Sequence, residues 1–243
     1  FNFELLYNIK QFPNDSILQK LGIKNNDIDD IIKNSIRAQE SFNNKNSVGF
    51  VKTHNMLFNF EKKYFFTNFE NSLGVIYIVR DPRNLVLSYA RHLDISIEET
   101  VKFVTLGKGN KNDFMGNWAE NFLSWKAFKN HNKYLLIKYE DLISDPKKNL
   151  MKIIEFIFTL RNIRLPIDTN KIDNVIRSTT LDNVKNLETK NNFQESVKDN
   201  DGKKINFFDK GGQRDWSKSL KKNLIDQIEK SFKREMIELG YLK

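Results

Sequence analysis

Residues 75–84 read Val-Ile-Tyr-Ile-Val-Arg-Asp-Pro-Arg-Asn and mark a point where a strand gives way to a helix. The first five form an unbroken run of β-branched and aromatic residues, which is typical of a strand with both faces buried. Asp81 and Pro82 supply an N-cap and a proline at the first helical position, so we expect a helix through His92. A buried strand followed at once by a helix is the repeating step of an α/β fold.

Two other runs share this character, residues 48–52 (Val-Gly-Phe-Val-Lys) and 134–138 (Tyr-Leu-Leu-Ile-Lys). We expect both to be buried parallel strands, and the polar stretch 1–46 to form short helices joined by loops. The predicted fold class is α/β, in three layers around a parallel sheet, within a single domain. Apolar stripes at helical spacing predict further helices, at Trp118, Phe122 and Trp125, at Leu150, Ile153, Ile154 and Ile157 after Asp145-Pro146, and at Ile225, Ile228, Phe232, Met236 and Leu239 before Gly240.

The composition excludes several kinds of functional site before any motif is considered. The chain has 243 residues and no cysteine, which excludes disulfides, cysteine-ligated metals and thiol nucleophiles. Its apolar runs are far shorter than the roughly 20 residues that a membrane span needs. A formal net charge of +9 predicts an anionic partner: nucleic acid, a membrane surface or a phosphorylated small molecule. The absence of cysteine also fits the reducing cytoplasm, where we expect the protein.

Polar side chains follow each of the three expected strands. Lys52-Thr53-His54 ends the first, Arg80 follows the second, and Tyr139 follows the third. Ligands in parallel α/β sheets bind at the carboxyl ends of the strands, so we expect these side chains at one rim of the sheet.

Arg80 and Ser88 are spaced to bind a phosphate. Ser88 lies seven residues after the expected N-cap Asp81, nearly two turns along on the same helix face. A guanidinium, a hydroxyl and the free N–H groups of a helix N-terminus would then converge on one anion. The spacing alone does not favour this interpretation over the alternative, in which Arg80 pairs with Asp81 or another carboxylate and Ser88 is incidental.

Four motifs resemble those of sulfotransferases that use 3′-phosphoadenosine 5′-phosphosulfate (PAPS). Residues 77–84 with Ser88 resemble the 3′-phosphate-binding motif of the family, and residues 51–54 (Val-Lys-Thr-His) resemble its Lys-Thr-His segment. Residues 138–142 (Lys-Tyr-Glu-Asp-Leu) resemble its Tyr-Glu-Asp-Leu signature. Residues 207–216 (Phe-Phe-Asp-Lys-Gly-Gly-Gln-Arg-Asp-Trp) resemble its late Arg-Lys-Gly…Asp-Trp loop. The motifs follow one another in family order.

The resemblance implies sulfuryl transfer from PAPS to a hydroxyl or amine acceptor, with adenosine 3′,5′-bisphosphate (PAP) as product and no metal. It makes His54 the catalytic base, a task that suits an imidazole, and Lys52 a group that steadies the sulfuryl oxygens or orients the acceptor. Tyr139 would contact the adenine. The residues implied for nucleotide binding are Arg80, Ser88, Tyr139, Lys210, Gly211 and Arg214.

Two departures from the family pattern bear on this interpretation. Asp209 stands where the family usually carries Arg, which places a negative charge beside the expected phosphate; Arg214 is a candidate replacement cation. Nothing in residues 1–46 resembles the 5′-phosphosulfate-binding loop of the family. We therefore expect one P-loop NTPase-like sulfotransferase domain, residues 1–243, that lacks its first strand and phosphate loop, is N-terminally incomplete and is poorly active alone. The alternative is a degenerate family member that has lost the loop.

Other interpretations stay open. A P-loop nucleotide kinase would share the sheet architecture, although no Walker-type loop is visible. A non-catalytic basic module could bind polyanions, although no RNA-binding signature is visible. His54 could instead be a strand-end histidine that binds a neighbouring carbonyl. The expected partner is a small-molecule or carbohydrate acceptor, with no specific nucleic acid.

Overall fold

The computed structural model describes residues 10–24, 27–43, 48–107, 114–190, 197–198, 202, 204–209 and 215–243. The chain divides into two compact units. The first unit comprises residues 2–75 and 107–134, and the second unit comprises residues 76–106 and 135–243. Whether they behave as the single domain expected from the sequence stays a prediction.

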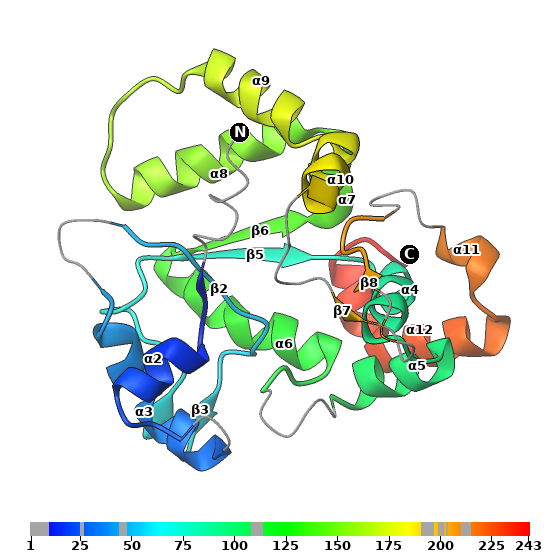
Figure 1. Cartoon of the computed structure of the whole chain (residues 1–243), viewed down its shortest axis with the longest axis horizontal. Helices are drawn as coiled ribbons and strands as arrows, with labels where there is room; N and C mark the ends of the chain where they lie inside the picture. The colour runs from blue at the N-terminus through cyan, green and yellow to red at the C-terminus, as the bar shows by residue number, and fades with distance from the viewer. Residues whose placement is uncertain are drawn as a thin grey trace. The chain divides into compact units, whose positions relative to one another are not determined.

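The first unit is built from two-residue strands and short helices (Figure 1). Strand β1 (Lys10–Gln11) pairs in parallel with β2 (Val51–Lys52), and β3 (Asn59–Phe60) pairs antiparallel with β4 (Tyr64–Phe65). The helices are α2 (Asp15–Lys20), α3 (Ile28–Glu40), α6 (Trp118–Trp125) and the 3₁₀ helix η1 (Lys126–His131). Helices α2 and α3 confirm the prediction for residues 1–46, whereas β1 was not predicted.

The local sequence explains where these helices begin. The Asn14 side chain accepts a hydrogen bond from a first-turn N–H of α2, and Asp27 does the same for α3. At the start of α6, Asn117 and Glu120 form a reciprocal capping box. Each cap satisfies backbone donors that a helix cannot satisfy internally.

An aromatic cluster fills the core of the first unit. The ring of Phe66 lies 5.4 Å from Phe12, 5.4 Å from Phe58 and 5.8 Å from Trp125, measured between centroids. Trp125 lies 6.0 Å from Phe128, and all five side chains are buried. Aromatic pairs at these separations add stabilisation beyond that of the buried area. The helix predicted from Trp118, Phe122 and Trp125 is confirmed as α6, and all three side chains are buried.

The prediction for residues 48–52 is confirmed only in part. Strand β2 consists of Val51 and Lys52 alone, and its partner is β1. Phe50 and Val51 are exposed, with relative accessibilities of 52% and 40%, so the expected burial is wrong. An unbroken apolar run carries no polar residue to mark a solvent face, and the sequence pattern therefore overestimates burial.

In the second unit, β5 (Val75–Val79) and β6 (Tyr134–Lys138) pair with each other, and both have the predicted bounds. Figure 1 shows β5 leading into α4 (Pro82–Leu93) and β6 leading into α7 (Tyr139–Ser144). Val79 and Ile137 are buried, but Ile78 is 54% exposed. The expected burial of both sheet faces is therefore wrong, while the strand-to-helix steps are confirmed.

The remaining elements of the second unit surround this pair. Asp81 caps α4 and Asp145 caps α8, each followed by proline as predicted. Helix α4 packs against α5 and α12, and α8 packs against α7 and α9. These elements are α5 (Ile97–Leu106), α8 (Pro146–Leu160), α9 (Thr169–Ser178), α10 (Leu181–Lys190), α11 (Trp216–Ser219) and α12 (Lys222–Glu238), with the antiparallel strands β7 (Val197–Lys198) and β8 (Lys204–Ile205).

The two predicted apolar stripes of this unit differ in burial. On α12, Ile228, Phe232 and Met236 are buried, and Gly240 follows the helix with a φ of 70°, as its predicted stop role requires. The helix predicted from the stripe on α8 is confirmed, and the stripe itself is half-buried. The buried residue of α8 is Asn149, whose amide donates to the carbonyls of Asp141 and Asp145.

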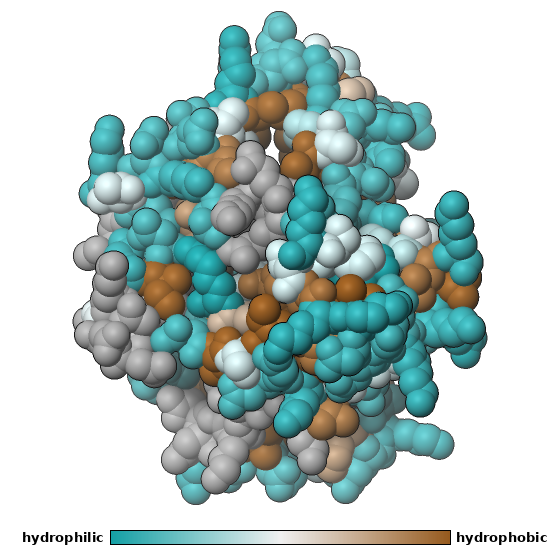
Figure 2. Space-filling model, turned by 90° about the vertical axis from the view of Figure 1, so that its right-hand side faces the viewer, coloured by the Kyte–Doolittle hydropathy of each residue, from teal (hydrophilic) through white to brown (hydrophobic). Residues whose placement is uncertain are grey.

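The face drawn in Figure 2 is predominantly polar. Hydrophilic side chains cover most of the face in Figure 2, with hydrophobic residues in patches among them. Within the ranges that the structure describes, no helix is long and apolar enough to cross a membrane.

Two isoleucines on α12 provide a matched test of the core. Ile228 is completely buried, whereas Ile237 is 45% exposed. We expect Ile228→Ala to lower the free energy of unfolding by about 2–5 kcal/mol, because it removes buried methyl groups and leaves a cavity. Ile237→Ala, the same change on the same helix, should cost less than about 1 kcal/mol. Urea denaturation measures both, and equal losses would contradict the packing described.

Candidate functional site

Arg80 and Tyr139 come together at the ends of the paired strands. Arg80 directly follows β5, and Tyr139 directly follows β6. The guanidinium carbon of Arg80 lies 4.4 Å from the centre of the Tyr139 ring, a cation–π contact. The second and third strand ends therefore deliver side chains to one place, as the sequence predicts.

Asp81 is bound by Arg83. Its Oδ1 accepts the Arg83 backbone N–H at 2.9 Å, which caps α4, and also accepts Arg83 Nε at 3.0 Å. Its Oδ2 accepts Arg83 Nη2 at 2.7 Å. Both carboxylate oxygens of Asp81 therefore bind the Arg83 guanidinium in a buried, bidentate ion pair.

The same guanidinium reaches three further groups. Arg83 Nη1 donates to Glu229 at 2.7 Å, Nη2 donates to the Tyr241 carbonyl at 2.9 Å, and the guanidinium carbon lies 3.9 Å from the Trp216 ring. Burial alone would lower the pKa of Arg83, but the hydrogen bonds and charges of Asp81 and Glu229 outweigh it and raise that pKa. Arg83 therefore stays charged inside the unit.

Glu140, two residues after β6, binds the backbone that follows β5. Its Oε1 accepts the Asp81 N–H at 3.0 Å, and its Oε2 accepts the Tyr241 hydroxyl at 2.8 Å. Burial, followed by the negative charge of Glu140, raises the pKa of Tyr241 well above its ordinary value. Glu140 binds a backbone group rather than forming half of a paired-carboxylate site.

Ser88 is half-buried on α4. Helical serines often donate to the carbonyl four residues earlier. Within the part of the chain that the structure describes, however, the Ser88 hydroxyl makes no hydrogen bond. Its binding to an anion, expected from the sequence, stays a prediction.

Lys52 and His54 belong to the first unit, at the end of β2. Lys52 is half-buried, and the His54 side chain is exposed. The His54 carbonyl accepts Asn121 Nδ2 at 2.9 Å, so the backbone is fixed at the residue whose side chain faces solvent.

Helix α6 also holds the residues after His54. Trp125 Nε1 donates to the Asn55 carbonyl at 3.0 Å, and Ser124 Oγ accepts the Leu57 N–H at 2.9 Å. This role was not predicted from the sequence, because the apolar pattern of α6 does not show which backbone groups its polar atoms bind. The spacing of Asn121, Ser124 and Trp125 on one helix face was the available signal.

Three predicted nucleotide-binding residues, Lys210, Gly211 and Arg214, lie outside the described residues. Asp209, immediately before them, forms an ion pair with Arg91 at 3.5 Å. The carboxylate that departs from the family pattern therefore has a cation beside it.

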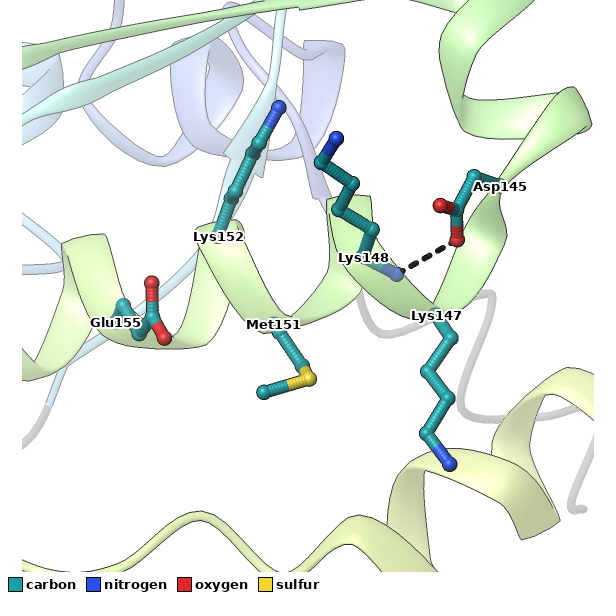
Figure 3. A pocket seen from close by; sticks show the side chains of 6 residues that line it. All are labelled: Asp145, Lys147, Lys148, Met151, Lys152 and Glu155. Carbon is teal, nitrogen blue, oxygen red and sulfur yellow. Dashed lines mark hydrogen bonds between the residues drawn. The ribbon is translucent and has the colours of Figure 1, made fainter.

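A pocket lies elsewhere in the second unit. It has a volume of about 380 Å³ along α8 and includes none of the predicted site residues; Figure 3 shows its lining. Lys147 is paired with Asp173 at 2.8 Å, and the Lys148 backbone N–H donates to Asp145 at 3.0 Å. Among the described residues, no cluster of His, Asp and Glu side chains could hold a metal ion.

The sequence matches the sulfotransferase domain family over residues 7–240, so the chain belongs to this family. It is 22% identical over 174 residues to the amine sulfotransferase of Oryctolagus cuniculus, covering 68% of this chain and 55% of the relative. It is 25% identical over 187 residues to cytosolic sulfotransferase 13 of Arabidopsis thaliana, covering 69% of this chain and 53% of the relative. The chain thus spans about half the length of these relatives.

Solved structures support the same fold. Mouse sulfotransferase SULT7A1 complexed with PAP is similar with a TM-score of 0.53 and 20% identity, covering 77% of this chain and 66% of that one. A retinol dehydratase in complex with androsterone and PAP has a TM-score of 0.59 and 18% identity, covering 81% and 55%. The α/β fold is therefore that of the sulfotransferases. The predicted absence of its first strand and phosphate loop stays a prediction.

The raised pKa of Tyr241 predicts a pH dependence of stability. Because the folded state holds this proton more tightly, its stabilising contribution is present below the unfolded pKa of about 10 and is lost as the pH rises above it. Tyr241→Phe removes the titrating group. Between pH 9 and 11, unfolding free energies from urea denaturation should fall more steeply for the wild type, by up to about 1.4 kcal/mol per pH unit. Parallel slopes would contradict a raised pKa of Tyr241 in the folded state.

Proposed function

We propose that this protein transfers the sulfuryl group of PAPS to a hydroxyl or amine acceptor. The single observation that carries the proposal is the contact of Arg80 with Tyr139 beside the N-terminus of α4. The two similar solved structures named above were determined with PAP, which supports the same nucleotide here. Membership of the sulfotransferase family favours this activity over a P-loop kinase or a non-catalytic polyanion-binding module.

The 3′-phosphate would bind Arg80, Ser88 and the N-terminus of α4. A guanidinium offers charge-assisted bidentate hydrogen bonds, and a helix N-terminus adds N–H donors and a favourable dipole. The negative charge of Asp81 does not oppose this binding, because Arg83 binds both oxygens of that carboxylate. Tyr139 would contact the adenine while its ring orients Arg80.

His54 would act as the general base. The acceptor oxygen or nitrogen attacks sulfur and forms a new bond, while the bond from sulfur to the bridging oxygen of PAPS breaks. The electron pair of that bond leaves with PAP, and the acceptor proton passes to the imidazole of His54. Lys52 would stabilise the sulfuryl oxygens. The backbone contacts from α6 support this proposal because they fix the residue while its side chain stays exposed.

The family motif adds three further residues to the proposed nucleotide site, Lys210, Gly211 and Arg214. The amine sulfotransferase among the relatives favours a small-molecule acceptor, and the relative named cytosolic favours a cytoplasmic location.

Arg80 is the first residue to test. Arg80→Ala removes the proposed charge-assisted bonds to the 3′-phosphate, and titration calorimetry on the full protein should show PAP binding weakened by roughly 10- to 100-fold. The matched control Arg164→Ala removes an exposed arginine between α8 and α9 and should leave affinity nearly unchanged. A wild-type protein without affinity for PAP would overturn the proposed function.

A substitution of His54 tests whether sulfuryl transfer can be lost while nucleotide binding is kept. We expect His54→Ala to lower the rate of sulfuryl transfer from PAPS to a panel of phenols, alcohols and amines by about 10²- to 10⁴-fold. PAP affinity should change little. His131→Ala, at the end of η1, is the control for loss of an imidazole. Equal loss of binding and transfer in His54→Ala would show that His54 has a structural role instead.

A further inference from the structure

Asn121 joins two chain segments beside the proposed general base. Its Nδ2 donates to the His54 carbonyl at 2.9 Å and to the Met115 carbonyl at 2.8 Å. The Met56 N–H donates to the Phe114 carbonyl at 2.7 Å, so the backbones of the two segments are also joined directly. The position of the His54 backbone therefore depends on the segment that precedes α6.

Gly107 lies against the same segment. A Cβ added to Gly107 would lie 2.4 Å from the backbone nitrogen of Asn117 and 2.7 Å from the carbonyl carbon of Gly116. Hard-sphere contacts forbid so close an approach, and a side chain here would therefore displace residues 116–117. The φ of Gly107, 67°, also lies in the left-handed region that favours glycine. Gly107 thus lets the chain that follows α5 pack directly against the start of α6.

We propose that Asn121 and Gly107 are positioning residues for the proton transfer from the acceptor to His54. This inference rests on the proposed function. Asn121 fixes the His54 backbone directly through its amide. Gly107 fixes it indirectly, because the segment that it supports supplies the second carbonyl that Asn121 binds. Both residues act through the backbone of His54 and need no contact with a substrate.

The backbone contacts matter because the His54 side chain is exposed. A general base must come within about 2.6–3.2 Å of the group whose proton it accepts. Misplacement of a reacting group by about 1 Å can slow a reaction about 100-fold. The imidazole side chain is short, so a shift of the His54 backbone is passed on to the ring.

The nucleotide should be affected much less than the chemistry. Three of the residues proposed to bind PAP, Arg80, Ser88 and Tyr139, belong to the second unit, whereas Asn121 and Gly107 belong to the first. Loss of positioning should therefore lower the rate of transfer and leave the affinity for PAP nearly unchanged.

Asn121→Leu removes both amide donors without adding a charge, since leucine has nearly the shape of asparagine. With the acceptor of the panel above that the wild type sulfates fastest, we expect kcat to fall at least about tenfold. Calorimetry should show an affinity for PAP within about twofold of the wild type. Asn43→Leu is the matched control, because the Asn43 Nδ2 also donates to two oxygens in the first unit, the carbonyl and Oδ1 of Asn71 at 3.1 and 2.8 Å. Its kcat should change less than about twofold.

Gly107→Ala tests the second position. Gly22, also in the first unit, has a similar φ of 69°, and a Cβ added there would meet nothing within 4 Å. Gly22→Ala thus carries the same backbone strain without displacing a neighbour. We expect Gly107→Ala to lower kcat at least about fivefold and Gly22→Ala to change it less than about twofold. Urea denaturation checks that both variants are folded, and Asn121→Leu decides the question if Gly107→Ala is not.

A double variant separates positioning from a general structural role. Because Asn121 acts through His54, Asn121→Leu should lower the single-turnover rate of His54→Ala by less than about twofold. An equal fold-loss in both backgrounds, an unchanged kcat in Asn121→Leu, or a loss of PAP affinity as large as the loss of kcat would overturn the inference while leaving the proposed function standing. A wild type that transfers no sulfuryl group to any acceptor of the panel would overturn both.

Discussion

The buried guanidinium of Arg83 joins parts of the second unit that are far apart in the sequence. It binds Asp81 at the start of α4, Glu229 on α12 and the carbonyl of Tyr241, and it stacks on Trp216. A buried charge is tolerated only where its donors are satisfied, and removing one partner of such a pair typically costs about 3–5 kcal/mol. The geometry at the end of β5 therefore depends on the C-terminal helix and the residues that follow it.

The end of β6 depends on the same C-terminal residues. Lys138, the last residue of β6, donates to the Leu239 carbonyl at 2.9 Å and lies 4.3 Å from the Tyr241 ring. Tyr241 in turn donates to Glu140, which accepts the N–H of Asp81. A closed set of hydrogen bonds thus fixes the backbone on either side of Arg80 and Tyr139. Their contact is a consequence of the polar network beneath it.

The sequence predicts the parts of this arrangement that are governed by local rules. The bounds of β5 and β6 follow from unbroken apolar runs, and the start of α4 follows from Asp81 and Pro82. The resemblance to a family singled out Arg80 and Tyr139, which the structure brings into contact.

The parts that sequence reasoning missed are long-range. Nothing local to Arg83 shows that its partners include Glu229, which lies 146 residues away in the chain. Nothing local to Trp125 shows that its indole N–H binds the backbone beside His54 rather than packing in a purely apolar core. Burial of β2 and β5 was overestimated for a related reason, because an apolar pattern indicates which face can be buried and tertiary packing decides whether it is.

Arginines of α4 pair with two acidic residues that border the proposed nucleotide site. Asp81 and Asp209 both border segments assigned to the 3′-phosphate, and each is paired with an arginine of α4, Arg83 or Arg91. The carboxylates can therefore serve as a helix cap and a backbone anchor without opposing a bound anion. The formal net charge of +9 is a sum over the whole chain, so it does not show where an anion would bind. At the start of α4, Arg83 already binds both oxygens of Asp81, so the carboxylate that caps the helix does not oppose the proposed anion.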